Sequence, residues 1–244
     1  MRFDGTEVLA GKGAQADVFL YKGYAYKVYR ETYPVEWIEF EKKQQREVNK
    51  AGLCPVRYFD TDDPHIIRMD YIDGEMLETI VNRCATGGKT DEIEDVMDGF
   101  KTLSKVFKFV HKADITGIDI PRFADTAGMG LDPKQAEKIV SIIERISSKT
   151  KECVCHLDIH FLNIMFPRDR SGFKIIDWMN SRLAPPVFDY ARTYVIFKEV
   201  SEPVLDIYKA TVLPDLKELH ITDSDFSDAV EVCTIVRARE RNLS

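Results

Sequence analysis

The sequence predicts an α+β fold with two lobes, a small β-rich lobe at the N-terminus and a larger helical lobe after it. Alternating apolar residues and tight turns, which are typical of strands, dominate the first ~75 residues. Most longer segments after that point repeat their apolar residues every three or four positions, as helices do. A turn at Asp73-Gly74 separates the two patterns, so we expect one lobe over residues 1–74 and the other over residues 75–244.

Strands and one helix account for the N-terminal lobe. Residues 6–30 have the pattern of strands, and a turn at Lys22-Gly23 joins two of them as a hairpin. The segment Pro34–Lys50 is rich in Glu, Lys and Gln, and we expect a helix that stops at Gly52. Two further strands are expected at VRYF and HIIRMDYI.

The C-terminal lobe is expected to be mainly helical. Apolar residues recur at helical spacing in Met76–Arg83, Glu92–Lys112, Asp132–Lys149, Glu202–Lys209 and Asp223–Arg241. The third segment has a favourable start, because Asp132 is a capping residue and Pro133 fits the first helical position. Short apolar runs at Val154–Asp158 and Lys174–Trp178 predict two strands within this lobe. Ligands favour the cleft between two such lobes.

Composition and charge exclude several classes of protein. Of the 244 residues, 44% are hydrophobic and 31% charged, and the formal net charge is -7. An acidic protein is a poor general binder of nucleic acid or anionic membrane, because phosphate groups demand a basic surface. No apolar run is long enough to span a bilayer, and the first residues lack the apolar core of a signal peptide. We therefore expect a cytoplasmic protein.

The cysteines are expected to be free thiols. Their spacing matches neither a zinc ribbon nor a disulfide framework: Cys54, Cys84, Cys153, Cys155 and Cys233. Free cysteine packs as a small hydrophobic group, which favours buried thiols over metal ligands and agrees with a reducing compartment.

The stretch CVCHLDIHFLNIMF, residues 153–166, contains three groups that bind metals or move protons. These groups, His156, Asp158 and His160, lie two positions apart, so on a strand they would all face one way. By itself the pattern fits either a metal centre or a proton-transfer site, and the neighbouring motifs have to decide between them.

Several other motifs occur in a fixed order around this stretch. Gly11-Lys12-Gly13 lies at a hairpin turn, Lys27 on the next strand, Asn163 five residues after Asp158, and Ile176-Asp177-Trp178 on a later strand. Together they resemble the aminoglycoside phosphotransferase and choline kinase family. The family's catalytic segment HGDLHPGN appears here as HLDIHFLN, followed by its Ile-Asp-Trp segment, and IIRMDYIDG and VFDYART are also similar. The resemblance implies a bilobal protein-kinase-like fold and phosphoryl transfer from ATP with Mg²⁺.

The resemblance also implies roles for the matching residues. Asp158 would be the general base that orients the acceptor hydroxyl and takes its proton, a role worth roughly 10²–10⁴ in rate. Asn163 and Asp177 would supply oxygen ligands for Mg²⁺. Lys27 would pair with the α- and β-phosphates of ATP.

Further residues would complete the nucleotide site. Gly11 and Gly13 would let backbone N–H groups near Ala14–Ala16 cover the phosphates. Lys27 needs an acidic partner on the following helix, and Glu41 is the first choice, with Glu39 and Glu47 as alternatives. At the hinge, Met69 would line the adenine pocket and the backbone of Asp70 to Ile72 would form hydrogen bonds with the base.

The family resemblance makes Asp158 the reactive group of the opening stretch. His156 is then a structural residue that supports the catalytic loop, and His160 is assigned no ligand role. A His-x-Asp-x-His metal centre, the alternative, would not explain why Asn163 and the Ile-Asp-Trp segment are present. Leu157 stands where the family has glycine, and Phe161-Leu162 where it has Pro-Gly; these larger residues could reshape the loop without removing a catalytic group.

The acceptor is expected to be a small molecule. Only twelve positions separate Asp177 from Asp189, which leaves little room for the long segment with which protein kinases dock a peptide. An aminoglycoside, a choline-like amine and another metabolite hydroxyl all stay open. Acidic residues of the helical lobe would suit a cation if they lined the cleft, and otherwise cap helices and face solvent: Asp125, Asp223, Asp225, Asp228 and Glu231.

Two other functions remain as alternatives, a non-catalytic nucleotide-binding module and an atypical protein kinase with a short activation segment. The preference for ATP or GTP and the oligomeric state are left open by the sequence.

Overall fold

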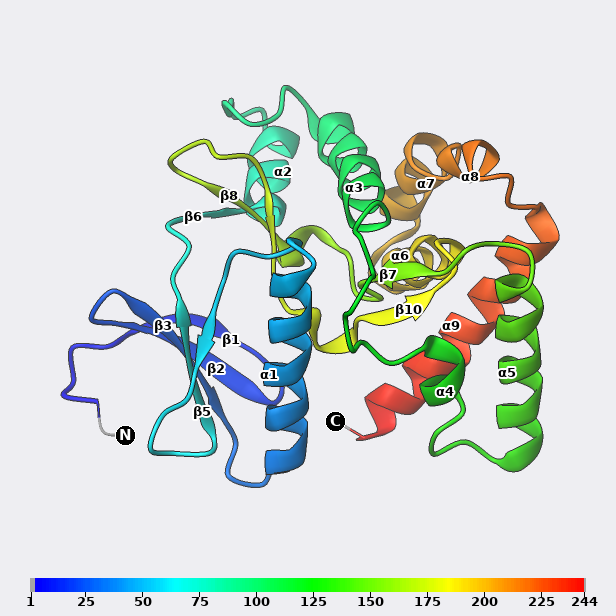
Figure 1. Cartoon of the computed structure of the whole chain (residues 1–244). Helices are drawn as coiled ribbons and strands as arrows, with labels where there is room; N and C mark the ends of the chain where they lie inside the picture. Colours follow the sequence, from blue (N-terminus) through cyan, green and yellow to red (C-terminus); the bar gives the residue numbers. More distant parts are fainter. Residues whose placement is uncertain (1–2, 244) are drawn as a thin grey trace.

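An antiparallel sheet of five strands forms the N-terminal part of the molecule (Figure 1). Its order is β1-β2-β3-β5-β4, with β1 at Val8–Lys12, β2 at Ala16–Tyr21, β3 at Tyr24–Tyr29, β4 at Tyr58–Phe59 and β5 at Ile66–Asp70. In this register Gly11 pairs with Val18, and Val18 pairs with Lys27. Because paired residues of antiparallel strands project to the same face, the glycine turn and Lys27 share one face of the sheet. The computed structural model describes residues 3–243, so the outermost residues of the two expected lobes, 1, 2 and 244, lie outside it.

Helix α1 (Val35–Lys50) lies between the sheet and the rest of the chain (Figure 1). Its Ile38 is fully buried and belongs to one apolar cluster with Ile67 of β5. The helix is followed by Gly52 with φ 70°, and Leu53 N–H donates to the Val48 carbonyl, 3.0 Å away. A residue with positive φ after the last turn is a common helix terminator, as the sequence indicated.

The chain passes from the first sheet to a second one within a few residues. Strand β6 (Gly74–Met76) pairs with β8 (Ile164–Pro167), which pairs with β9 (Lys174–Ile175). A side chain at Gly74 would come within 2.4 Å of the Phe166 carbonyl oxygen, so this crossing needs glycine. A separate two-stranded ribbon joins β7 (Cys153–Cys155) to β10 (Arg182–Ala184).

Helices make up the rest of the molecule. They are α2 (Leu77–Ala85), α3 (Val96–Val110), α4 (Phe123–Ala127), α5 (Pro133–Ser147), α6 (Val187–Val200), α7 (Glu202–Thr211), α8 (Asp215–Glu218) and α9 (Asp223–Leu243), with short 3₁₀ turns η1 (Phe161–Asn163) and η2 (Trp178–Asn180). Helix α6 packs between α7 and α9 and is buried over most of its length. The mixed architecture, with a sheet-rich first part and a helical second part, confirms the predicted fold class.

The two strands expected in the helical lobe are shorter than predicted. Strand β7 ends at Cys155 and β9 ends at Ile175, so the residues after each of them lie in loops. His156, Asp158 and His160 therefore do not lie on a strand, and the alternation that a strand would give them does not occur. Leu157 has φ 58° and Asp177 has φ 64°, and such left-handed residues turn the chain sharply at the end of each strand.

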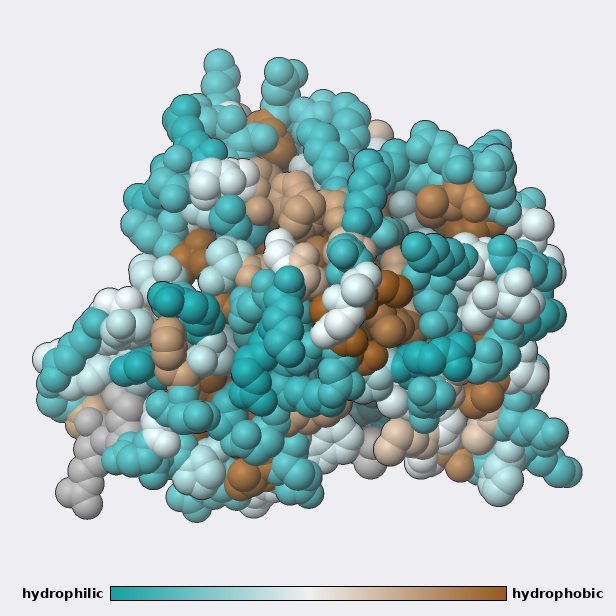
Figure 2. All heavy atoms as spheres, in the orientation of Figure 1, coloured by the Kyte–Doolittle hydropathy of each residue, from teal (hydrophilic) through white to brown (hydrophobic). Residues whose placement is uncertain are grey.

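The face of the molecule shown in Figure 2 is mainly hydrophilic, and hydrophobic residues form separate small groups on it. Within residues 3–243, no helix combines the length and the apolar character needed to cross a membrane.

Candidate active site

Lys27 on β3 joins the two halves of the molecule through two carboxylates. Its Nζ lies 2.8 Å from Glu41 Oε1 on α1 and 3.5 Å from Asp177 Oδ1, which follows β9. Burial alone would lower the pKa of Lys27, but the negative charges of Asp177 and Glu41 raise it well above its ordinary value. The amine therefore stays protonated and positively charged where the sheet meets the helical part.

Glu41 is held in place for this ion pair. The carboxylate is 2% exposed, and the hydroxyls of Tyr29 and Tyr58 donate to it over 2.5 and 3.3 Å. The two alternative partners are engaged elsewhere, since Glu39 pairs with Lys42 and Glu47 pairs with Lys50. The structure thus forms the pair that the sequence favoured, between Lys27 and Glu41.

The loop that follows β7 is fixed by one buried carboxylate from α6. Asp189 is 1% exposed and accepts hydrogen bonds from the backbone N–H groups of His156 (3.1 Å) and Leu157 (2.7 Å). His111 Nε2 also bonds to Asp189, at 2.9 Å. Left-handed backbone at Leu157 costs of order 1–3 kcal/mol for a residue with a Cβ, and these bonds hold it in that conformation. The same geometry gives a physical reason for a glycine at this position in similar sequences.

His156 links this loop to the strand that leads to Asp177. The imidazole is fully buried, its Nε2 lies 3.0 Å from the Ile176 carbonyl, and the ring lies 4.6 Å from that of Trp178. Burial lowers the pKa of His156, so the ring is neutral. These contacts agree with the supporting role predicted for His156.

Asn163 connects Asp158 with the segment that carries Asp177. Its Nδ2 donates to the Asp158 carbonyl oxygen (2.9 Å) and lies 3.4 Å from Asp158 Oδ2, while its own carbonyl accepts from Ile176 N–H at 3.0 Å. No donor to Asn163 Oδ1 is found among the described residues. The amide oxygen is thus available as a hard ligand, and together with the half-exposed carboxylate of Asp177 it fits a Mg²⁺ ion.

Asp158 is ionised in this setting. Burial would raise its pKa, but His160 and Arg192 outweigh burial and lower the pKa to about 2. Its two oxygens face different neighbours: Oδ2 lies near Asn163 and His160, whereas Oδ1 lies 3.9 Å from Nη1 of Arg237 on α9. Arg237 was not predicted from the sequence, where it is one of several charged residues on an ordinary helix.

The glycine turn and the hinge lie on the same sheet as Lys27. Gly13 N–H donates to the Ala16 carbonyl at 2.9 Å, and a Cβ at Gly13 would approach that oxygen to 2.9 Å, so the turn needs glycine there. Gly11 follows a register shift in β1 and has more space, with Val18 Cβ at 3.9 Å.

At the hinge, one expected hydrogen-bond donor is already used. The Asp70 N–H donates to the Arg57 carbonyl at 3.1 Å, and the Asp70 carboxylate pairs with the Arg57 guanidinium. No partner for Ile72 N–H is found within the described chain, and Met69 packs against the main apolar core. The Asp70 N–H is therefore not available to adenine, and Ile72 stays as the predicted N–H donor to the base.

Three of the five acidic residues considered for a cationic acceptor pair with another helix of the same lobe. Asp225 and Asp228 pair with Arg145 of α5, and Glu231 pairs with Lys138 of the same helix. They hold α9 against α5, which is a structural role.

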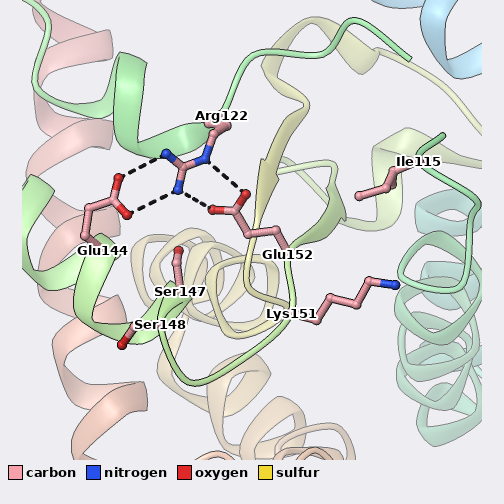
Figure 3. A pocket seen from close by; sticks show the side chains of 7 residues that line it. All are labelled: Ile115, Arg122, Glu144, Ser147, Ser148, Lys151 and Glu152. Atoms are coloured by element: carbon pink, nitrogen blue, oxygen red, sulfur yellow. Dashed lines mark hydrogen bonds and ion pairs between the residues drawn. The ribbon is translucent and has the colours of Figure 1, made fainter. Parts of the chain in front are cut away.

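One cluster of potential metal ligands and one cavity lie apart from the site around Lys27 and Asp158. In the described residues, one cluster of three potential metal ligands is formed by His111, Cys153 and Cys155, and it does not include His156 or His160. A cavity of about 400 Å³ lies beside Arg122, whose guanidinium is held between Glu144 and Glu152 (Figure 3). Neither the cluster nor this cavity contains Lys27, Asp158 or Asp177.

Comparison with protein families identifies the chain. The model of the phosphotransferase enzyme family matches residues 7–221, which is most of the sequence and contains every residue of the site described above except Arg237. The chain belongs to this family. A comparison with curated proteins returns no match.

Solved structures of other phosphotransferases share the fold. The choline kinase LicA from Streptococcus pneumoniae superposes with a TM-score of 0.58 at 14% identity, covering 96% of this chain and 82% of that one. The aminoglycoside phosphotransferase APH(3'')-Id from Streptomyces rimosus gives 0.62 at 12% identity, covering 96% and 93%. An ethanolamine kinase from Plasmodium vivax gives 0.60 at 13% identity, covering 98% and 75%. At such low identity the likeness establishes the kinase-like fold of this phosphotransferase.

Replacing Asp189 by asparagine tests how this phosphotransferase holds its catalytic loop. The change removes a buried charge and puts an NH₂ group where an oxygen accepts backbone N–H bonds, so we expect the free energy of unfolding to fall by about 3 kcal/mol. Urea denaturation followed by circular dichroism measures this change. Asp206→Asn is the control, since that exposed carboxylate pairs only with Lys209 within α7 and should change stability little. Equal stability of the Asp189 variant and the parent would contradict the assigned role.

Proposed function

We propose that this phosphotransferase transfers the γ-phosphoryl group of ATP to a hydroxyl of a small molecule, with Mg²⁺ as cofactor. One observation carries the proposal. A chain of contacts joins Lys27 to Asp177, the Asp177 segment to Asn163, and Asn163 to Asp158. Lys27 is thus connected to Asp177, Asn163 and Asp158, which lie far from it in the sequence. The contacts lie beside the sheet that carries the glycine turn.

The proposed step follows from the position of Asp158. Its carboxylate accepts the proton of the acceptor hydroxyl while the new O–P bond forms, the bond to the β-phosphate oxygen breaks, and ADP leaves. With a pKa of about 2, the carboxylate is ionised throughout the physiological range and needs no prior loss of a proton. As a weak base it contributes mainly by orienting the hydroxyl.

In this proposal, Lys27 binds the phosphates of the nucleotide, and Asn163 and Asp177 bind its Mg²⁺ ion. Lys27 carries a fixed positive charge for the α- and β-phosphates, and Glu41 keeps its amine in place. Asn163 Oδ1 and the Asp177 carboxylate would hold Mg²⁺, whose contribution when bound is to neutralise negative charge on the phosphates. The Ile72 N–H would donate to the adenine ring.

The short segment between Asp177 and α6 supports a small-molecule acceptor over a protein. It is occupied by the turn η2, strand β10 and two prolines, and β10 is paired with β7. Little of the segment is left to dock a peptide, and we therefore rank the atypical protein kinase below the small-molecule kinase. The non-catalytic alternative ranks lower too, because an ionised Asp158 next to Asn163 has no role in nucleotide binding alone.

A turnover screen tests the proposal. Purified protein with Mg²⁺ and γ-³²P-labelled ATP is incubated with hydroxyl-containing amines, aminoglycosides, sugars, nucleosides and hydroxy acids, and labelled products are separated. We expect a labelled small molecule whose formation requires both Mg²⁺ and acceptor. Label found only on added proteins would favour the protein kinase alternative, and no labelled product with any acceptor would contradict the proposed function.

A further inference from the structure

The last turns of α9 bring one arginine next to Asp158. Arg237 Nη1 lies 3.9 Å from Asp158 Oδ1, and its Nε donates to Glu199 Oε2 at 2.6 Å. Glu199 also accepts a hydrogen bond from Arg241, so two guanidinium groups share this carboxylate.

A second group of arginines lies behind Asp158. Arg192 of α6 pairs with Glu240, and Glu240 also lies 3.8 Å from Arg239. Arg239 donates to three backbone carbonyls of the segment 126–129. Arg182 of β10 donates to Thr126 Oγ1, at 3.1 Å, and its interactions with Glu240 and Arg239 place it in the same group.

Arginines gather around two carboxylates in this region. Among the described residues, three arginines lie around Glu240 and two around Glu199: Arg182, Arg192, Arg239, Arg237 and Arg241. Burial lowers the pKa of Arg182 to about 10 and also lowers that of Arg239, whereas at Arg192 the carboxylates of Glu240 and Asp158 outweigh burial and raise the pKa. Arg192 is 4% exposed, and its buried Nε has no hydrogen-bond partner. Buried cations without full compensation are costly, and an anion bound nearby would offset that cost.

The two oxygens of Asp158 face different groups, one on the side proposed for the nucleotide and one on the side of α9. Asn163, a proposed metal ligand, lies at Oδ2, whereas Arg237 lies at Oδ1. An acceptor hydroxyl that approaches Asp158 from the α9 side would therefore meet Arg237 first. A cationic acceptor would meet the guanidinium of Arg237 there, and Asp225, Asp228 and Glu231, which could have attracted it, pair with α5 instead.

We propose that the acceptor carries an anionic group, a carboxylate or a phosphate, which Arg237 binds while the acceptor hydroxyl faces Asp158. The proposal rests on the function proposed above and narrows its acceptor to anionic hydroxy compounds. Arginine suits both anions, because its planar guanidinium donates two parallel hydrogen bonds to either.

A set of acceptors that differ mainly in charge tests the proposal. Glycerate, glycerol 3-phosphate, glycerol and 3-amino-1,2-propanediol share a three-carbon frame and present a carboxylate, a phosphate, no charge and a cation. Binding is measured by thermal shift of the Asp158→Asn protein with Mg²⁺-ADP, and transfer by kcat/KM of the parent protein. We expect one or both anionic compounds to rank first in both measurements, and their order tells whether a carboxylate or a phosphate is preferred.

Variants of Arg237 then connect the preference to this residue. Arg237→Ala should raise KM for the anionic acceptor about tenfold or more, because hydrogen bonds to charged groups are worth roughly 1.5–3 kcal/mol, and should leave KM for Mg²⁺-ATP unchanged. Arg237→Lys, which keeps the charge, should recover part of the loss. Arg170→Ala is the matched control, since its exposed guanidinium pairs with Asp91, and it should leave both KM values unchanged.

The outcomes separate failure of this inference from failure of the proposed function. A neutral or cationic compound that ranks first in transfer would leave the phosphotransferase function standing and overturn the anionic acceptor. A fall in kcat of Arg237→Ala without a rise in acceptor KM would also overturn it, since Arg237 would then act on the transferred phosphoryl group. Binding of an anionic compound that depends on Arg237, without transfer to any acceptor, would instead contradict the proposed function.

Discussion

Replacing Asp158 by asparagine is expected to lower kcat about 10²–10⁴-fold while leaving the affinity for Mg²⁺-ATP nearly unchanged. Asparagine keeps the shape of the side chain but cannot take the hydroxyl proton. The parent carboxylate is ionised, with a pKa of about 2, so the variant removes a negative charge that the parent carries at every physiological pH. Initial rates at saturating ATP and acceptor measure kcat, and isothermal titration with a non-hydrolysable ATP analogue measures affinity.

The matched control for this prediction is Asp98→Asn. Asp98 lies in the first turn of α3, far from the site in sequence, and its carboxylate pairs with Lys101 of the same helix. We expect its kcat to equal that of the parent. An Asp158→Asn protein that is folded and fully active would remove Asp158 from the role of base.

Replacing Asp177 by alanine is expected to weaken binding of ATP in the presence of Mg²⁺ roughly a hundredfold. Asp177 is half-exposed, lies 3.5 Å from Lys27, and is the one carboxylate assigned to the metal. Without it, a Mg²⁺ ion would keep only the amide oxygen of Asn163 from this pair of ligands. Kd values from titration calorimetry, measured with Mg²⁺ and with EDTA, check the prediction.

The two conditions make the second prediction specific to the metal. In EDTA the variant should bind ATP as well as the parent or better, because the phosphates no longer face the Asp177 charge. If Mg²⁺ strengthened ATP binding equally in both proteins, Asp177 would not be a metal ligand.

The sequence predicts those elements whose signals are local. Helix α5 begins with Asp132 as its N-cap, which accepts from Gln135 N–H at 3.1 Å, and Pro133 occupies its first position, as expected from the residue types alone. The end of α1 before Gly52 follows from the same kind of signal. Capping and termination depend on a few neighbouring residues, so tertiary contacts have little influence on them.

Helix α6 was missed because it has no polar face. Ten of its fourteen residues are buried, so apolar residues occur on every side and the sequence lacks the stripe that marks a surface helix. Strands β6, β8 and β10 were missed for another reason. They have only three or four residues each, and they exist because their partners lie far away in sequence, such as Gly74 with Pro167.

Some residues of the candidate site were predicted from the sequence, and others were found only in the structure. Motif residues such as Lys27, Asp158 and Asp177 were found because their types and order resemble a family, and the structure brings them together. Arg237 carries no motif, and only the packing of α9 shows that it lies near Asp158. The proposal of an anionic acceptor therefore could not be made from the sequence alone.

The central claim, that Lys27 and Asp177 act on one bound Mg²⁺-triphosphate, is tested most directly by a double-mutant cycle. Binding of Mg²⁺-ATP is measured for the parent, Lys27→Met, Asp177→Ala and the double variant. Residues that share a ligand are coupled, so we predict that the double variant loses less binding free energy than the sum of the single losses, by about 0.5 kcal/mol or more. Strictly additive losses, or single variants that bind like the parent, would contradict the account.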